Sequence, residues 1–213
     1  MPVPSECRIA RERGHTVVAL VRHGQTEWNV TRRFLGATDL PLDSTGRAQA
    51  RALGELFAGT FDRVYSSPLA RARDTARELG SEPILVPELV EMSQGELEGL
   101  SRDEAITRFP GLFEALLADP AEMIPPGGEN LTTVRDRAFR GLERVVRAEP
   151  VGSLLAFVSH QMVIASVSCT ISGQPLDSWR EHGVQNCAIT FLAWDGDKFH
   201  PLVRGYRPEA RTA

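Results

Sequence analysis

The sequence predicts an α/β fold with a mostly parallel mixed sheet held between helices. Runs rich in β-branched and apolar residues alternate along the chain with stretches of helical periodicity, an order typical of parallel strands joined by crossover helices. The last two strand-like runs flank Asp195-Gly196-Asp197, a turn sequence typical of a β-hairpin. We therefore expect a mixed sheet that ends in a C-terminal antiparallel hairpin.

Each element has its own sequence signal. The expected strands are the apolar runs at 16–22, 62–66, 83–87, 153–159, 187–194 and 198–204. The expected helices, whose apolar residues recur at helical spacing, are 46–58, 67–79, 130–147 and 161–171. Ser67 followed by Pro68 predicts the start of the second of these helices, and Asn130 predicts the start of the third.

The length of the chain suits one hydrophobic core. At 213 residues, the chain is expected to form one domain over 15–205. Residues 1–14 contain prolines and charges and are expected to be a flexible leader, and 206–213 are expected to be a tail. The segment 100–128 interrupts the alternation of strands and helices, so we expect it to be a helical excursion over one end of the sheet.

Composition limits the classes of partner. The net charge of -4 argues against a general nucleic-acid surface or anionic-membrane surface, and no uninterrupted apolar stretch approaches the length of a membrane span. Cys7, Cys169 and Cys187 are odd in number and widely spaced, so neither a disulfide framework nor a metal site is expected. The default compartment is the reducing cytoplasm.

Polar groups follow two of the expected strands. The first strand runs directly into Arg22-His23-Gly24, and the fourth ends in Ser159-His160. In α/β proteins the carboxyl ends of the strands are where ligands bind. Either histidine alone could be an ordinary structural group. Together with a neighbouring arginine, they predict an anion site that contains a nucleophile.

Transfer of a phosphoryl group to a histidine needs a neutral imidazole, cations around the phosphoryl oxygens and a proton donor for the leaving oxygen. His23 is the candidate nucleophile. Arg22 offers a planar fork for oxygens, and Arg71 sits in the first turn of a predicted helix, again just after a strand. His160 is expected to be a second, protonated imidazole that donates to the phosphate.

The proton donor is expected in the loop that follows the third strand. Glu91 is the candidate, but Glu88, Glu96 and Glu98 lie in or beside the same loop. Spacing alone does not choose among these four carboxylates.

Backbone groups could add further anion contacts. Gly24 allows the chain to turn tightly and to approach a phosphate closely. Thr26 could cap a short helix whose N–H groups face the anion. A second helix is expected to begin at Gln161, directly after His160, and the backbone N–H of Gln161 would also face the anion.

The order of these blocks resembles the histidine phosphatase superfamily, which includes the cofactor-dependent phosphoglycerate mutases. The resemblance extends from about 17 to 193 and rests on the blocks at 22–29, 36–42, 46–50, 66–72 with 75–76, 89–91 with 95 and 98–99, 126–130 and 158–160. Several blocks in the family's order are far more specific than any one of them.

The resemblance implies a three-layer α/β/α sandwich with one catalytic domain and with 100–128 over its active site. His23 would carry the phosphoryl group, Glu91 would be the proton donor and then the base for water, and no metal or organic cofactor is implied. The phosphoryl oxygens would be held by Arg22, Arg71 and His160. The residues expected to contact the substrate are Gly24, Gln25, Thr26, Asn29, Leu35, Gly36 and Gln161.

Departures from the family pattern bear on the substrate. The mutases typically have an arginine where this chain has Met92, and a small hydroxyl residue where it has Leu35. The family commonly has glycine after His160, where this chain has Gln161-Met162. A pocket edged by Leu35, Met92 and Met162 suits a substrate with some apolar surface. We therefore expect hydrolysis of a small phosphorylated metabolite, with a bisphosphoglycerate-dependent mutase and a non-catalytic binding module as the alternatives.

Overall fold

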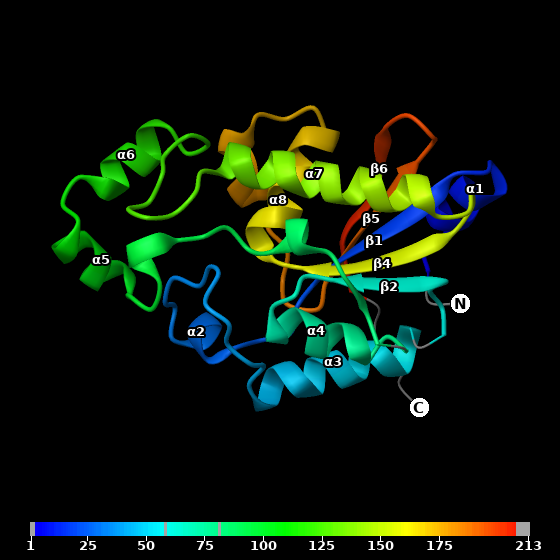
Figure 1. The fold of residues 1–213 in the computed structure, drawn as a ribbon, viewed down its shortest axis with the longest axis horizontal. Coiled ribbons are helices and arrows are strands. Elements are labelled where there is room, and N and C mark those ends of the chain that lie inside the picture. Colours follow the sequence, from blue (N-terminus) through cyan, green and yellow to red (C-terminus); the bar gives the residue numbers. More distant parts are fainter. Residues whose placement is uncertain (1–2, 58, 81, 208–213) are drawn as a thin grey trace.

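The computed structural model describes residues 3–57, 59–80 and 82–207, and its centre is a six-stranded sheet in the order β3-β2-β4-β1-β5-β6 (Figure 1). The strands are β1 (Thr16–Arg22), β2 (Arg63–Ser66), β3 (Ile84–Leu85), β4 (Leu154–Ser159), β5 (Ile189–Trp194) and β6 (Phe199–Tyr206). β1, β2, β3 and β4 pair in parallel, β5 runs antiparallel to β1, and β6 runs antiparallel to β5. The predicted mixed sheet and C-terminal hairpin are confirmed.

Helices cover both faces of this sheet. They are α1 (Ser5–Glu12), α2 (Glu27–Val30), α3 (Ser44–Phe57), α4 (Ala70–Arg77), α5 (Arg102–Arg108), α6 (Leu112–Ala118), α7 (Leu131–Ala148) and α8 (Gln161–Ile171), with 3-10 turns η1 (Pro87–Leu89), η2 (Gly95–Leu97) and η3 (Leu176–His182). Figure 1 shows α7 and α8 on one side of the sheet and α3 and α4 on the other. This is the expected three-layer α/β/α sandwich.

The central strand β1 explains why the sheet is sandwiched. Its side chains alternate between two cores: Val18 and Leu20 pack with residues of α7 and α8, whereas Val17, Ala19 and Val21 pack with residues of α1, α3 and α4. All five side chains are fully buried. A continuous apolar run is the pattern expected of a strand that is covered on both faces, and full burial of each Val or Leu side chain contributes roughly 1.5–3 kcal/mol.

Most element boundaries agree with the sequence signals. Asn130 caps α7 by accepting a hydrogen bond from the N–H of Thr133 at 2.9 Å, and α8 has the predicted bounds. The helix expected over 46–58 begins at Ser44 and ends at Phe57, and residue 58 lies outside the described residues. β3 is shorter than expected because Pro87, which has no N–H for a sheet hydrogen bond, begins η1.

Two expectations are wrong. Helix α4 begins at Ala70 rather than at Pro68, and its N-cap is Leu69 in an extended conformation. The expected flexible leader contains α1, whose Cys7 and Ala10 are buried against β1 and its neighbours. These two small side chains are three positions apart and therefore share one face of the helix. Residues 1–2, and 208–213 of the expected tail, lie outside the described residues, and Tyr206 still belongs to β6.

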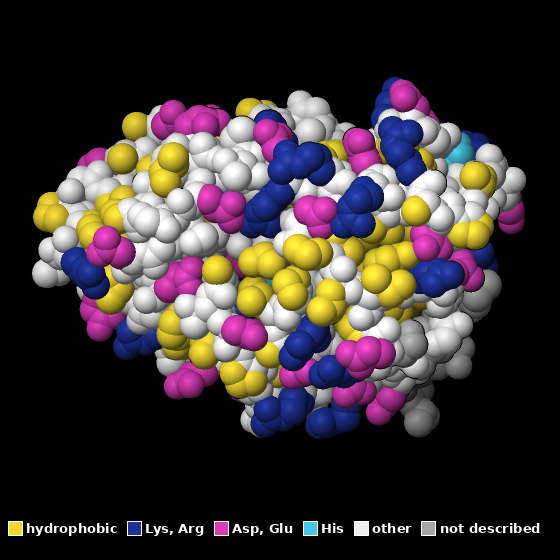
Figure 2. Space-filling view, viewed as in Figure 1, with side chains coloured by type: hydrophobic (Ala, Val, Ile, Leu, Met, Phe, Trp, Pro, Cys, Tyr) yellow, Lys and Arg dark blue, Asp and Glu magenta, His cyan; other side chains and the backbone are white. Residues whose placement is uncertain are grey.

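The segment 100–128 contains two short helices, and its residues 119–128 are not helical. Its helices α5 and α6 extend beyond the end of the sheet at which β1 passes into α2 (Figure 1). Every residue of α6 is described, and none of them is buried. Hydrophobic side chains are visible over this end in Figure 2, and the exposed ones include Ile106, Leu117 and Ile124.

The surface charges, the helix lengths and the cysteines bear on the classes of partner. Acidic and basic side chains are interspersed on the face shown in Figure 2. Within the described ranges, no helix is both long enough and apolar enough to cross a lipid bilayer. Cys7, Cys169 and Cys187 are free thiols.

Candidate active site

Parallel pairing brings the two strand-end histidines together. β1 pairs with β4 so that Arg22 lies opposite Ser159. The next residue on each strand is a histidine, and the ring centroids of His23 and His160 are 5.1 Å apart. β2 pairs with the other edge of β4, and α4, which follows β2, carries Arg71 to the same end of the sheet.

A cavity of about 640 Å³ opens at this end of the sheet. The predicted site residues that line it are Arg22, His23, Asn29, Leu35, Arg71, Glu91 and Gln161. Those that lie outside its lining are Gly24, Gln25, Thr26, Gly36 and His160. His160 nevertheless sits directly behind the lining, against the ring of His23.

His23 is held as a neutral imidazole. Its Nδ1 lies 2.6 Å from the carbonyl oxygen of Gly24, and because a carbonyl only accepts hydrogen bonds, Nδ1 carries the proton. Burial, followed by the charges of Arg71 and Arg22, lowers the pKa of His23 well below its usual value. Nε2 is therefore unprotonated, which is the form that a nucleophilic imidazole requires.

Two arginines line the same cavity as His23, and the guanidinium group of each donates to backbone carbonyl groups: one for Arg22 and two for Arg71. Arg71 is fully buried and donates from Nη1 to Thr38 at 2.8 Å and from Nη2 to Gly36 at 2.7 Å. Arg22 donates to the carbonyl of Val184 at 2.7 Å. The Nε atoms of both arginines are buried and have no hydrogen-bond partner among the described residues. A buried donor without a partner is costly, so both groups are suited to an anion.

His160 differs from its predicted state. Its Nε2 lies 2.8 Å from the hydroxyl of Ser67, and its buried Nδ1 has no partner among the described residues. Burial, followed by the charges of Arg71 and His23, lowers the pKa of His160 well below its usual value. The structure therefore favours a neutral ring, and not the expected imidazolium, because a second buried charge beside Arg71 is unfavourable.

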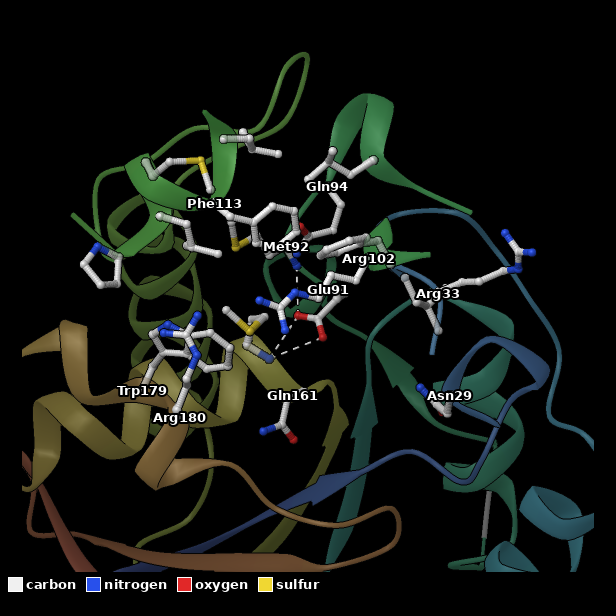
Figure 3. A pocket seen from close by; sticks show the side chains of 18 of the residues that line it. Asn29, Arg33, Glu91, Met92, Gln94, Arg102, Phe113, Gln161, Trp179 and Arg180 are labelled. Atoms are coloured by element: carbon white, nitrogen blue, oxygen red, sulfur yellow. Dashed lines mark hydrogen bonds between the residues drawn. The ribbon is translucent and has the colours of Figure 1, made fainter. Parts of the chain in front are cut away.

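Glu91, which follows η1, also lines the cavity. Its Oε1 accepts hydrogen bonds from the backbone N–H of Met92 at 2.9 Å and of Met162 at 3.2 Å, drawn as dashed lines in Figure 3. Burial raises the pKa of Glu91, although these two N–H groups and the charge of Arg71 act against the shift. A buried carboxyl with a raised pKa is suited to proton donation.

The structure distinguishes Glu91 from the other carboxylates of its loop. Glu88 and Glu96 form ion pairs with arginines on α7 and α5, both at 2.9 Å or less. Glu98 accepts backbone N–H bonds from the loops at 37–38 and 94, which joins those loops. Of these four carboxylates, Glu91 is the one that lines the cavity.

Thr26 is the N-cap of α2, as expected, but the expected anion contacts of the backbone at 24–26 are not supported. The N–H groups of Gly24, Gln25 and Thr26 donate to side chains on α4, α3 and α2, at 3.0, 2.9 and 3.1 Å. A Cβ at Gly24 would lie 2.6 Å from the carbonyl oxygen of Gly46. Glycine is therefore needed here for close packing against α3 rather than for approach to an anion.

Gly36 and Gln161, both predicted to contact the substrate, also make contacts within the protein. The buried Gly36 presents its carbonyl to Arg71, and a Cβ there would lie 2.3 Å from Glu98 Oε1. Gln161 accepts a hydrogen bond from the N–H of Val184 at 3.3 Å while it lines the cavity (Figure 3).

Asn186 is a site residue that sequence reasoning missed. Its Nδ2 donates to the carbonyl oxygen of His23 at 2.9 Å and lies 3.4 Å from Oδ1 of Asn29. The next residue, Cys187, has a left-handed backbone with φ 58°, which is uncommon for a residue other than glycine. Its position just before β5 was the available signal, but a turn asparagine is too common to single out.

Arg137 on α7 was also missed, because it lies beside the apolar stripe of that helix. Its Nη1 donates to the carbonyls of Glu88 and Val90 at 2.8 and 2.5 Å, and its Nη2 to the carbonyl of Glu91 at 3.1 Å. Its Nη2 also pairs with Glu129 at 2.6 Å. One side chain thus fixes the backbone on which Glu91 is carried.

The outer part of the cavity is apolar. Leu35 and Met92, together with Met162, line it as the sequence predicts. Phe34, residues of α6 and Trp179 of η3 extend this surface away from His23. Among the described residues, no group of three or more His, Cys, Asp or Glu side chains is placed to hold a metal ion.

Comparison with known proteins gives the family. A model of the histidine phosphatase superfamily (branch 1) matches residues 18–205. The chain belongs to the histidine phosphatase superfamily. The predicted family and the predicted phosphatase class are confirmed by this match and by the names of its relatives.

Relatives of this phosphatase-family protein carry more than one name. This chain is 36% identical over 165 residues to the uncharacterized phosphatase PhoE of Bacillus subtilis, and the match covers 74% of this chain and 78% of PhoE. The chain is 34% identical over 179 residues to the probable phosphoglycerate mutase GpmB of Photorhabdus laumondii, covering 81% and 82%. The solved structure of Bacillus stearothermophilus YhfR superposes with a TM-score of 0.83 at 31% identity, covering 90% of this chain and 98% of that one.

Proposed function

We propose that this protein is a phosphomonoester hydrolase that acts on a small phosphorylated metabolite through a phosphohistidine intermediate on His23. One observation carries the proposal. The neutral His23 has its Nδ1 proton committed to a carbonyl, and it lines the same cavity as Arg22 and Arg71, whose buried Nε donors lack partners in the described part of the chain. This is a nucleophile beside donors for a phosphoryl group.

In the first step, Nε2 of His23 attacks phosphorus and the bond from phosphorus to the alcohol oxygen breaks. Glu91, whose pKa is raised by burial, is the acid in our proposal: it gives a proton to that oxygen, and the alcohol leaves. Arg22 and Arg71 hold the equatorial oxygens as charge redistributes. His160 stays neutral and donates to a phosphoryl oxygen from Nδ1, which has no other partner among the described residues.

In the second step, water attacks the phosphohistidine from the side that the alcohol has left. Glu91, now a carboxylate, takes a proton from that water while the bond between Nε2 and phosphorus breaks. Inorganic phosphate leaves, Glu91 is again protonated, and His23 is again neutral. The sum is one ester and one water converted into one alcohol and one phosphate.

The cavity favours hydrolysis over the mutase alternative. A mutase must hold a small polyanion and return the phosphoryl group to it before water reacts. Here Met92 follows the acid, and the outer cavity is lined mainly by apolar side chains. Conversion of 2-phosphoglycerate to 3-phosphoglycerate with negligible phosphate release would favour the mutase.

Trapping of the intermediate tests the mechanism and the binding-module alternative together. Wild-type protein mixed with a ³²P-labelled aryl phosphate and quenched at alkaline pH should retain acid-labile label, whereas His23→Ala should retain none and release no phosphate. His200→Ala is the matched control, because His200 lies on β6 and bonds to Asp195. Label in His23→Ala, or its absence in the wild type, contradicts the proposal.

The cellular setting is part of the proposal. Three free thiols favour a reducing compartment, so we place the protein in the cytoplasm. The substrate is a small molecule held by the cavity, and neither nucleic acid nor a membrane is required as a partner.

A further inference from the structure

The cavity is much larger than the phosphoryl site. Its volume of about 640 Å³ lies in the range of pockets that enclose drug-sized ligands. Arg22, His23, Arg71 and Glu91 account for its inner end. The proposed reaction assigns no role to the apolar side chains that line the remainder.

Helix α6 forms one wall of this outer part. Its Leu112, Phe113 and Leu116 line the cavity, and they lie at helical spacing on one face. None of the residues of α6, all of them described, is buried. The apolar face of this helix therefore faces the cavity instead of packing into a core.

The opposite wall is also apolar. Met162 at the start of α8 and Trp179 of η3 line it, and Figure 3 shows Trp179 across the pocket from Asn29. Met92 and Phe113 also line the cavity. Aromatic and thioether side chains on facing walls are adaptable contacts for hydrocarbon groups.

The arginines of the cavity do not form a second anion site near the phosphoryl group. Arg33 is paired with Glu104 at 2.9 Å. Arg102 and Arg180 are exposed and lie over the rings of Phe113 and Trp179, at 5.3 and 4.5 Å from the ring centroids. Each of these three guanidinium groups is thus held against a side chain of the protein.

We propose that the space between α6 and η3 binds the alcohol part of the substrate, and that this alcohol is an extended apolar group. The inference rests on the proposed function and specifies its substrate class: phosphomonoesters of long-chain or polycyclic hydrocarbon alcohols, in preference to phosphorylated hydroxy acids and sugars. Full burial of one methylene corresponds to about a fourfold gain in affinity, so a long apolar group gains affinity at every added carbon.

A homologous series of n-alkyl phosphates isolates this effect. From ethyl to octyl phosphate, the pKa of the leaving alcohol is nearly constant, so the chemical step is unchanged while the apolar surface grows. With each ester below its micelle concentration, kcat/KM should rise about twofold to fourfold per methylene, and octyl phosphate should exceed phosphoserine by at least about tenfold. A series that is flat within about threefold overturns the inference.

A pair of variants locates the effect. Leu116→Asn places an amide on the cavity wall, and Ile106→Asn makes the same change on α5 at a position that is 45% exposed and outside the cavity lining. Leu116→Asn should lower kcat/KM for octyl phosphate at least about fivefold and leave ethyl phosphate within twofold, whereas Ile106→Asn should change neither. Equal losses on both esters in Leu116→Asn contradict a role in alcohol binding.

Alkyl phosphonates, which cannot be hydrolysed, separate this inference from the proposed reaction. Calorimetry should show octylphosphonate binding more tightly than ethylphosphonate. If binding increases with chain length but no ester releases phosphate, the proposed function fails and the apolar site stands. If ethyl phosphate is hydrolysed as fast as octyl phosphate and the phosphonates bind equally, the inference fails and the hydrolase stands.

Discussion

The side-chain amide of Asn186 donates to the main-chain carbonyl of His23 at 2.9 Å. The same amide approaches Oδ1 of Asn29, which also accepts the N–H of Thr26. With Oδ1 held in this way, the amide nitrogen of Asn29 remains to face the cavity that Asn29 lines. One asparagine on the turn before β5 thus fixes both the backbone of His23, the proposed nucleophile, and the orientation of the Asn29 amide.

Replacement of Asn186 should slow the reaction with little effect on folding. A misplacement of about 1 Å at a reacting group can cost a hundredfold, so we expect Asn186→Ala to lower kcat/KM about tenfold to a hundredfold, mostly in kcat. Asn186→Asp should be worse, because it places carboxylate oxygens against two acceptor oxygens. Gln185→Ala, the exposed neighbour, is the control. A loss of thermal stability that accounts for the lost activity would argue against a positioning role.

The proton donor can be identified by leaving-group dependence. Glu91→Gln keeps the size of the side chain but cannot donate the proton, so alkyl phosphates should lose far more kcat/KM than phenyl phosphates, whose leaving oxygens need less protonation. Steady-state kinetics on both ester types measures the ratio. Equal losses on the two would assign the acid role to another group.

The pH profile should report the same carboxyl group. Because the pKa of Glu91 is raised, its protonated form persists above the usual range and is lost as pH increases, so kcat/KM for alkyl phosphates should fall on the alkaline side. That limb should disappear in Glu91→Gln. An unchanged limb in this variant would assign it to a different ionisation.

The buried histidines should make the fold sensitive to acid. The pKa of His160 is well below its unfolded value of about 6.5, so between those two values the unfolded chain binds a proton that the folded protein does not. Stability therefore rises with pH in this window and is lost as pH falls below about 6.5, with a slope of about 1.4 kcal/mol per pH unit for one such group.

His160→Gln isolates that contribution. The raised pKa of Glu91 has the opposite effect, because the folded protein retains a proton that the unfolded chain loses, so the difference between variant and wild type is the quantity to measure. Urea unfolding between pH 5 and 7 should give a shallower dependence in His160→Gln. Parallel curves would mean that His160 is protonated in the folded protein.

The sequence was sufficient for the fold and for the main charged groups of the site. His23 and His160 each follow a buried strand, and parallel pairing of those strands places them together. Their proximity was predictable because parallel neighbouring strands end at the same edge of a sheet, whichever side chains follow them. Arg71 could be found by the same logic, since it opens the helix after the adjacent strand.

Contacts between distant segments were not predictable. Gly24 suggested an anion loop, but its glycine is required by the approach of Gly46 on α3. Ser67 has the signal of a helix cap, and its hydroxyl accepts the N–H of Leu69 at 3.3 Å, but the same hydroxyl also bonds to Nε2 of His160 at 2.8 Å. The protonation of His160 depends on burial and on Arg71, neither of which is visible in the local sequence. Each of these properties exists only once the packed neighbours are known.

Arg137 shows how a residue outside the cavity can control the acid. Its guanidinium holds the carbonyls of Glu88, Val90 and Glu91, and a lysine cannot reproduce that fork. Both Arg137→Lys and Arg137→Ala should therefore lower kcat/KM for alkyl phosphates more than for phenyl phosphates, by about tenfold or more, because the displaced group is the proton donor. Arg140→Ala, on the exposed side of α7, is the matched control. A loss that is equal for both esters, or equal in Arg140→Ala, would mean that Arg137 supports the fold and not the position of Glu91.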